Sequence, residues 1–165
     1  NQLVKGSIFV HFLGIDMHDN AFARPGQSLT RGVARQLFDL GFVSLEEFVP
    51  RRGLRLDLFA LGPKGELWII ECKSSKGDFT SDSKWEKYLE WGDSFFWGVS
   101  EDFPKHILPK ETGLFIGDAY DATIIREAPY QPVAPARRKR LIHKFATKAA
   151  ERLHRMRDPD FMSSF

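Results

Sequence analysis

Cysteine is nearly absent from this chain of 165 residues, which contains only Cys72. A single cysteine excludes an internal disulfide framework and any metal site that needs several thiolates, and it suits a reducing compartment. Long apolar runs are absent as well, because none approaches the ~20 residues that a membrane-spanning helix requires. We therefore expect a cytoplasmic protein with no membrane partner.

Nucleotide-binding and histidine-based metal motifs are also missing. The chain has no P-loop and no GxGxxG fingerprint, which argues against a nucleotide-driven motor or a dinucleotide-dependent enzyme. Its five histidines, at positions 11, 18, 106, 143 and 154, show no spacing typical of metal ligands. The sequence therefore offers no nucleotide site of these kinds and no histidine-ligated metal site.

The chain does contain a strongly basic segment near its C-terminal end. Residues 136–157 hold nine of the 24 Lys and Arg residues and one of the 22 acidic residues, so the rest of the chain is acidic although the net charge is +2. A cationic arm on an acidic body suggests nucleic acid as the first partner to consider. The alternative is that these charges form only a solvated helix face.

The pattern of apolar residues predicts a single α/β domain. Hydrophobic residues make up 42% and charged residues 28% of the chain, which is ordinary for a globular protein of this length. Ser28 is a candidate N-cap for a first helix that ends at Gly41, and segments rich in apolar residues between turn residues predict strands. We expect strands at 43–49, 54–61, 66–73, 94–99, 113–117 and 122–126, and further helices at 83–91, capped by Asp82 or Ser83, and at 136–156. This order predicts a mixed central sheet flanked by helices, with the first three strands as an antiparallel meander.

We divide the chain into three parts. Residues 1–27 are expected to be an N-terminal extension, in which Met17 is an alternative start and residues 1–16 receive no function. Residues 28–128 form the core. Residues 129–165 hold a proline-rich connector and the basic helix, whose apolar residues are expected to pack on the same domain. These apolar residues are Leu141, Phe145, Ala149, Leu153 and Met156.

Charged residues interrupt the apolar strands at two places. Because side chains alternate along a strand, Glu71 and Lys73 project side by side from the end of the segment 66–73. The short turn before this segment lets Asp57, on the preceding strand, lie across from Glu71. Two carboxylates this close repel each other unless a cation lies between them, and Mg²⁺ or Mn²⁺ with oxygen ligands suits that role. Such a metal acidifies water and neutralises charge on phosphate, while Lys73 positions the water or stabilises the transition state.

A plainer interpretation stays open at this point. Glu71 and Lys73 can form a solvated ion pair at a strand end, and Asp57 can pair with Arg55 or Arg52.

The same residues resemble the PD-(D/E)xK nuclease superfamily, in which Asp57, Glu71 and Lys73 match the motif positions. The proline of that motif is missing, since Leu56 precedes Asp57. A closer resemblance, over about residues 28–156, is to the MmcB-like bacterial DNA repair proteins of this superfamily. The motifs that carry it are Glu47-Phe48, Gly53-Leu54-Arg55-Leu56-Asp57, Glu71-Cys72-Lys73-Ser74-Ser75, Asp78-Phe79, Asp82-Ser83-Lys84-Trp85-Glu86-Lys87-Tyr88 and Ala134-Pro135-Ala136-Arg137-Arg138-Lys139. The resemblance implies a restriction-endonuclease-like fold and a role in DNA repair.

Several further residues are candidates for the site. Glu47 is a possible additional metal ligand, and Glu46 is a second candidate for the same role. The alternative is that Glu47 is only an exposed residue of its strand. Lys84 and Tyr88 match a Gln-x-x-x-Tyr element of some members with lysine in place of glutamine, and we expect them one helical turn apart. Ser74 and Ser75 can donate to phosphate or only begin a loop. In the basic helix, Arg138, Lys144 and Lys148 are the expected phosphate contacts.

These observations lead to a function with open alternatives. We expect a Mg²⁺- or Mn²⁺-dependent deoxyribonuclease that acts on DNA in repair, with Asp57 and Glu71 as metal ligands and Lys73 serving the attacking water. The alternatives are a binding module of the same fold that grips DNA in a repair complex, and an enzyme that acts on RNA. A repair protein is a possible partner, and at most an association with the nucleoid is expected.

Overall fold

The computed structural model describes residues 25–82 and 84–160. The segment 1–16, with its alternative start at Met17, and the candidate cap Ser83 lie outside the described residues. The elements are α1 (Pro25–Asp39), β1 (Val43–Arg51), β2 (Leu54–Leu61), β3 (Leu67–Lys73), α2 (Lys76–Ser81), the 3₁₀ helix η1 (Trp85–Trp91), β4 (Ser94–Val99), the 3₁₀ helix η2 (Lys105–Ile107), β5 (Gly113–Gly117), β6 (Ala122–Arg126) and α3 (Pro135–Arg157).

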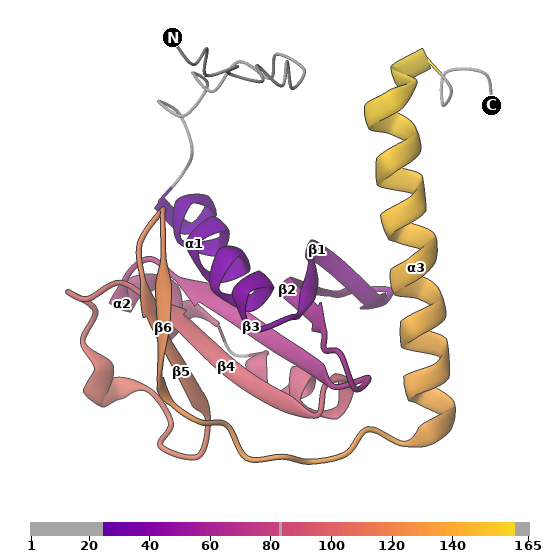
Figure 1. The fold of residues 1–165 in the computed structure, drawn as a ribbon. Coiled ribbons are helices and arrows are strands. Elements are labelled where there is room, and N and C mark those ends of the chain that lie inside the picture. Colours follow the sequence, from indigo (N-terminus) through magenta and orange to yellow (C-terminus); the bar gives the residue numbers. More distant parts are fainter. Residues whose placement is uncertain (1–24, 83, 161–165) are drawn as a thin grey trace, which may run out of the picture.

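The six strands form one open sheet in chain order, from β1 to β6 (Figure 1). Strands β1, β2 and β3 pair antiparallel, β3, β4 and β5 pair parallel, and β6 returns antiparallel to β5. The expected meander and the mixed α/β fold are therefore confirmed. No helix in these described ranges is long and apolar enough to cross a membrane.

Each face of the sheet is covered by different helices. On one face α1 buries Leu29, Val33 and Leu37 against strand residues such as Ile70 and Phe96. The other face carries a larger cluster, which receives residues from η1 and α3. Alternate side chains of a strand lie on the same face of the sheet, so Asp57, Glu71 and Lys73 belong to this second face. Phe59 and Ile69, on the same two strands, are buried there.

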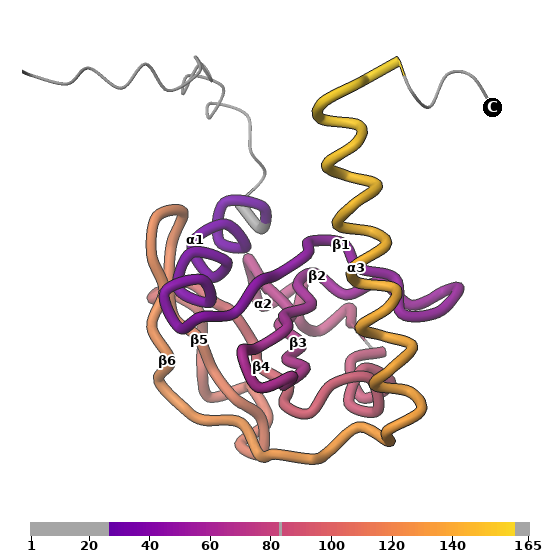
Figure 2. The backbone as a smooth tube through the Cα atoms, turned by 45° about the vertical axis from the view of Figure 1, so that its right-hand side comes forward, coloured from indigo at the N-terminus to yellow at the C-terminus, as the bar shows by residue number. Residues whose placement is uncertain are grey.

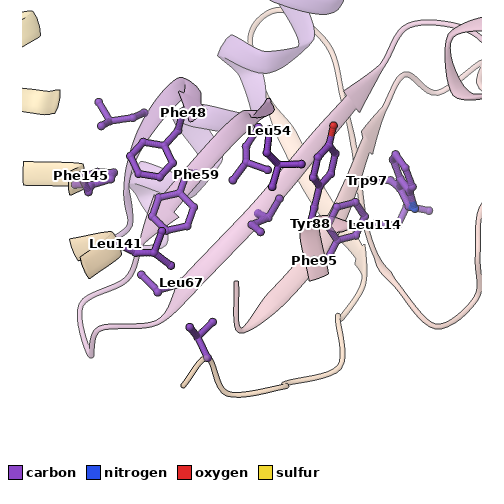
Figure 3. Packing of buried hydrophobic residues seen from close by; sticks show 14 of the residues in the cluster. Phe48, Leu54, Phe59, Leu67, Tyr88, Phe95, Trp97, Leu114, Leu141 and Phe145 are labelled. Atoms are coloured by element: carbon purple, nitrogen blue, oxygen red, sulfur yellow. The ribbon is translucent and has the colours of Figure 1, made fainter. Parts of the chain in front are cut away.

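The helix α3 packs on this second face through its first half. Figure 3 shows Leu141 and Phe145 beside Phe48 and Phe59, and the Phe145 ring lies 6.1 Å from that of Phe59 between centroids. Farther along the helix, Leu153 is 55% and Met156 79% exposed. The expectation that these two residues pack on the body is wrong, because α3 continues past the sheet and its end has no strand beneath it (Figure 2).

Three local expectations also differ from the structure. Helix α1 begins at Pro25, so Ser28 lies inside the helix and does not cap it. The short helix α2 occupies a segment for which no element is expected, and Ser75 caps it by accepting a hydrogen bond from the Asp78 amide. The expected helix 83–91 is a 3₁₀ helix that starts at Trp85 and has no capping side chain at its N-cap position.

The aromatic residues explain why η1 is a 3₁₀ helix. Trp85, Tyr88 and Trp91 recur every third residue, and a helix with three residues per turn places all of them on one side. That side faces the core, where Tyr88 is buried and both tryptophans are partly buried. An α-helix would spread the three over an arc of about 120°.

Candidate active site

Asp57 and Glu71 face each other where β2 and β3 part. The backbone pairing of the two strands ends at Leu58 and Ile70. Beyond this pair, each carboxylate accepts a hydrogen bond from the opposite strand: the Cys72 amide donates to Asp57 Oδ2 at 2.9 Å, and the Asp57 amide donates to Glu71 Oε1 at 3.1 Å. The side chains therefore take over the interstrand contacts, and the two acidic groups converge.

Lys73 lies beside this pair and is held by a third carboxylate. Its Nζ lies 3.8 Å from Glu71 Oε2 and donates a hydrogen bond to Asp82 Oδ2 at 2.7 Å. The ammonium also lies 5.8 Å from the centre of the Trp97 ring. Since the Lys73 side chain is only 8% exposed, these groups take the place of water around it.

Burial and mutual repulsion shift the ionisation of the two acids. Burial, and then the nearby Asp57 carboxylate, raise the pKa of Glu71 to about 9, against the hydrogen bond from the Asp57 amide and the attraction of Lys73. Burial likewise raises the pKa of Asp57, although the Cys72 amide opposes the shift. Without a cation the pair therefore holds a proton at neutral pH.

The lysine stays charged in this environment. Burial alone would lower the pKa of Lys73, but the hydrogen bond to Asp82 and the attraction of the surrounding acids outweigh it, and the pKa is raised. Burial similarly opposes ionisation of Asp82, yet bonds from Lys73 and from the Lys84 and Trp85 amides lower its pKa. Lys73 is thus suited to stabilise negative charge and not to accept a proton.

The three residues lie in a cleft of about 780 Å³. It is lined by Gln27 and Thr30 of α1, Glu46 and Glu47 of β1, Arg55 and Asp57 of β2, Glu71, Cys72 and Lys73 of β3, and by Ser74, Asp78, Ser81, Asp82, Lys84 and Tyr88. The Cys72 thiol is no candidate nucleophile, because burial raises its pKa. The chemistry of the cleft therefore belongs to its carboxylates and cations.

A divalent cation fits this donor set. In the part of the chain that the structure describes, no three His, Cys, Asp or Glu side chains form a group that could hold a metal ion. Two neighbouring carboxylates that repel each other match Mg²⁺, which is often bound by one or two carboxylates together with waters and a substrate phosphate. Asp57 and Glu71 are the residues that could hold it.

Glu46 and Glu47 line the cleft but do not belong to the Asp57–Glu71 pair. Both are exposed, and Glu47 forms an ion pair with Arg55 at 3.4 Å in which each side chain is 64% exposed. Glu47 also has a φ of 50°, in the left-handed region that non-glycine residues rarely adopt. It sits between the paired residues Glu46 and Phe48 of the edge strand β1, at the rim of the cleft.

Tyr88 and Lys84 both line the cleft but differ in burial. Tyr88 is 8% exposed, and burial with the nearby Glu71 and Asp82 charges raises its pKa, so its hydroxyl remains a donor. Lys84 is exposed and also lines the cleft. The two are not one helical turn apart as expected, because three residues complete a turn of η1.

Ser74 and Ser75 serve the start of α2. Asp78 Oδ2 accepts hydrogen bonds from the Ser74 amide at 3.2 Å and hydroxyl at 3.4 Å, and Ser75 Oγ accepts from the Asp78 amide at 3.1 Å. This reciprocal arrangement resembles a capping box. Ser74 lines the cleft, whereas Ser75 does not line it.

Arg138 does not belong to an exposed basic face, contrary to expectation. Its guanidinium bonds both oxygens of the buried Asp93 carboxylate, at 2.7 Å from Nη1 to Oδ2, and also the Gly65 carbonyl. Lys148 pairs with Glu151 one turn along α3, and Lys144 forms no ion pair within residues 25–82 and 84–160. Arg138 therefore anchors α3 to the body, with its guanidinium engaged by Asp93.

Sequence reasoning missed the role of Asp82 beside Lys73. Asp82 was expected only as a helix cap, and its Oδ1 does accept from the Lys84 amide at 2.9 Å. The signal was present in the Asp82-Ser83-Lys84-Trp85 motif, which resembles a family pattern. No spacing rule, however, connects Asp82 with a strand residue nine positions earlier.

Fold and site together define a class of protein. A helix, an antiparallel three-strand meander, a short helix and a parallel strand surround two carboxylates and a lysine at the end of the central strands, as the PD-(D/E)xK resemblance predicts. The family model "DNA repair protein MmcB-like" matches residues 17–160, and the chain belongs to this MmcB-like family.

One solved structure supports the same fold. It is a protein from Silicibacter pomeroyi, described as "SPO1766 protein of unknown function", that is 62% identical in sequence with a TM-score of 0.83. The match covers 84% of this chain and 95% of that chain. No curated protein matches the chain.

Proposed function

We propose that this protein is a metal-dependent DNA phosphodiesterase that acts in DNA repair. The observation that carries the proposal is the pair formed by the half-buried Asp57 and the buried Glu71, joined by the charged Lys73 in one open cleft. A pair of carboxylates that must share a proton without a cation is well suited to bind one. Membership of a DNA repair family supports DNA as the substrate.

Each residue then has a role in phosphodiester hydrolysis. Asp57 and Glu71 would hold Mg²⁺ or Mn²⁺ through their carboxylate oxygens. Such an ion supplies an acidified water and neutralises charge that develops on the phosphate. Lys73 remains an ammonium and stabilises the negative charge of the transition state, since a cation held rigidly in a buried site needs little reorganisation.

Asp82 acts through Lys73 in this account. The ammonium of an unrestrained lysine samples many rotamers, whereas the 2.7 Å bond to Asp82 fixes Lys73 Nζ beside Glu71. Asp82 is therefore a positioning residue. It also ties the segment before η1 to the site through the Lys84 amide.

The competing proposal is a DNA-binding module of the same fold with weak or absent cleavage. It is favoured by the donor set, because Asp57 and Glu71 are not joined by a third His, Cys, Asp or Glu side chain into a metal-binding group among the described residues. Both proposals place DNA at the cleft. They differ in whether a bound phosphate is cut.

A cleavage panel separates the two proposals. Purified protein is incubated with single-stranded, duplex, flapped and damaged DNA, and with RNA of the same sequence, in Mg²⁺, Mn²⁺ or EDTA. The nuclease proposal predicts cleavage of at least one DNA with metal and none in EDTA, and a loss of at least ~100-fold in Asp57→Asn and Glu71→Gln. The control variant Glu86→Gln removes an exposed carboxylate of η1 that does not line the cleft.

Other outcomes of the same assays would contradict these proposals. DNA binding without cleavage of any substrate by the wild type would replace the nuclease with the binding module. Undiminished cleavage in both acidic-site variants would place the active site elsewhere. Cleavage confined to RNA would overturn DNA as the substrate.

A further inference from the structure

The basic residues of α3 differ in how their charges are compensated. Arg137 pairs with Glu90, Arg138 with Asp93 and Lys148 with Glu151. The other basic residues of the helix form no ion pair among the described residues; they are Lys139, Arg140, Lys144, Arg152, Arg155 and Arg157. The helix therefore keeps a large uncompensated positive charge.

This charge is unevenly distributed around the helix. At about 100° per residue, positions 140, 144, 148 and 155 fall on one flank, which is also the flank of Arg137. Lys139 and Arg157 lie eighteen residues, or five full turns, apart on the far side. Glu151, the partner of Lys148, falls on the same flank, so the positive charge that remains there comes from Arg140, Lys144 and Arg155. The row Arg140, Lys144, Lys148 and Arg155 is called the basic flank below.

Contacts at the start of α3 fix the direction in which the basic flank points. Arg137 reaches Glu90 Oε2 at 3.0 Å, and its guanidinium lies 4.8 Å from the Trp91 ring. Both partners belong to η1, so the flank that carries Arg137 faces η1. The same 3₁₀ helix borders the cleft through Tyr88.

A second contact places the far half of α3 at the rim of the cleft. Arg152 donates to the carbonyl oxygen of Glu46, whose residue lines the cleft on β1. Beyond this contact, α3 rises past the sheet on the same side as the N-terminal end of α1 (Figure 1), and Gln27 near that end lines the cleft too. The basic flank therefore runs alongside the opening of the candidate active site.

The length of the basic flank and the spacing of its cations indicate what kind of ligand it fits. From Arg140 to Arg155 it extends about 22 Å along a rigid helix, with a cation every turn or two. A stiff polymer with regularly spaced anions matches such a row, and a duplex carries one phosphate per strand every 3.4 Å of axis, so the row spans about six base pairs. A flexible single strand would lose conformational entropy to follow the same line.

We propose that the basic flank binds the phosphate backbone of duplex DNA and so directs a duplex toward the cleft. The proposal rests on the proposed function in one respect: the cleft is taken as the place where a phosphate of the same DNA lies. Contacts to phosphate give affinity and orientation but read no base sequence. The flank therefore makes the protein selective for duplex DNA and indifferent to its sequence.

The test compares two double variants with the same change in net charge. Lys144→Glu with Arg155→Glu alters the basic flank, and Lys139→Glu with Arg157→Glu alters the opposite side. Binding of a fluorescent 20-base-pair duplex, and of one of its strands alone, is measured by anisotropy at several salt concentrations in EDTA, where no cleavage interferes. Thermal melts of both variants show whether the fold persists.

The two variants should behave differently. Loss of two phosphate contacts should flatten the slope of log K against log salt by about 1.8 and weaken binding at 0.1 M salt at least ~10-fold. The opposite-side variant should keep most of the wild-type slope. The neutral pair Lys144→Gln with Arg155→Gln should show the same change in slope, which answers any concern that charge reversal disturbs the helix.

Three results would overturn the proposal. Equal effects of the two double variants on duplex binding would mean that DNA responds only to the overall charge of the protein. An unchanged salt slope in both variants would mean that the basic flank is only solvated surface. Equal losses on single-stranded DNA would remove the selectivity for duplex. The outcome is independent of catalysis: a protein that binds through this flank and cuts nothing upholds the inference while the nuclease proposal fails.

Discussion

Glu71 is the residue whose ionisation controls the candidate site. Its side chain is almost fully buried, beside Asp57 and Lys73. The raised pKa, about 9, means that the metal-free protein carries a protonated Glu71 at neutral pH. Binding of a divalent cation must release that proton, so metal affinity should rise with pH.

The same shift predicts how the stability of the metal-free protein depends on pH. The unfolded chain releases the Glu71 proton near the ordinary pKa of 4.5, whereas the folded protein retains it to about 9. The folded state therefore binds more protons between these values, and stability falls as pH rises through this window. We expect Glu71→Gln, which has no proton to lose, to melt at least ~3 °C above the wild type at pH 8 in EDTA.

The comparison at a second pH is the control for this prediction. At pH 5 the wild-type Glu71 is protonated in the folded state, so most of the difference in melting temperature should vanish. A Glu71→Gln variant that melts below the wild type at pH 8, measured by calorimetry in EDTA, would show that Glu71 is stably ionised.

Asp82 provides the second prediction at the residue scale. Asp82→Asn keeps an acceptor for the Lys84 amide but removes the charge that holds Lys73 at 2.7 Å. We expect kcat to fall by about 10- to 100-fold, because a misplaced catalytic group costs rate. KM and the affinity for Mn²⁺ should change little, and Asp82→Glu should restore part of the rate.

A merely structural role for Asp82 would give another pattern. In that case kcat, KM and metal affinity would all decline with the melting temperature, and Asp82→Glu would rescue none of them selectively.

At the scale of elements, Asp93 connects α3 and its connector to the sheet. Its carboxylate is fully buried and accepts hydrogen bonds from the Leu67 amide, the Val133 amide and the Arg138 guanidinium, each within 2.8 Å. These bonds join the start of β3, the segment before α3 and α3 itself. One carboxylate therefore fixes the helix that carries the basic flank.

Removing the Asp93 charge should destabilise the whole domain. Asp93→Asn leaves the partly buried Arg138 without its counterion, and losing one partner of a buried pair costs about 3 kcal/mol, or roughly 10 °C in melting temperature here. Bonds from Arg138 and the amides lower the pKa of Asp93 against the effect of burial. The difference from the wild type should therefore persist above about pH 4 and shrink only at lower pH.

Two further variants check this prediction by thermal melting. Asp102→Asn, at an exposed acid, should change the melting temperature little. Adding Arg138→Gln to Asp93→Asn should cost less than the sum of the single changes; strict additivity would contradict the coupling.

The sequence predicted the strands better than the short helices. Strands β4, β5 and β6 have the expected bounds because turn residues flank continuous apolar segments. Helix α2 has no buried residue and depends on its cap at Ser75, so apolar spacing could not reveal it. The 3₁₀ form of η1 follows from aromatic spacing of three, which is easily taken for an α-helical pattern.

In the candidate site and its surroundings, too, local features were predicted from the sequence and a long-range ion pair was not. Strand parity and a short turn were enough to expect Asp57 across from Glu71, because both rules are local. Arg138 was expected in solvent because its partner Asp93 lies 45 positions away in the chain. Long-range ion pairs of this kind follow from packing, and no periodicity in the sequence encodes them.

For the whole molecule, the two covered faces of the sheet leave the cleft at the end where the central strands part. Helix α1 covers one face and α3 with η1 covers the other, and elements from both sides line the opening. Asp57 and Glu71 lie inside the cleft, while the unpaired cations lie on α3, which contacts the rim of the cleft at Glu46. This separation suits a polyanion that touches the helix and presents one phosphate to the acids.

We propose that Asp57 and Glu71 together hold a divalent cation. Anomalous diffraction from crystals soaked in Mn²⁺ tests it most directly, with Glu71→Gln crystals treated in the same way as the control. We expect an anomalous peak within coordination distance of both carboxylates in the wild type, and its loss or strong reduction in the variant. A wild-type map with no peak between Asp57 and Glu71, in crystals that bind Mn²⁺ elsewhere, would contradict it.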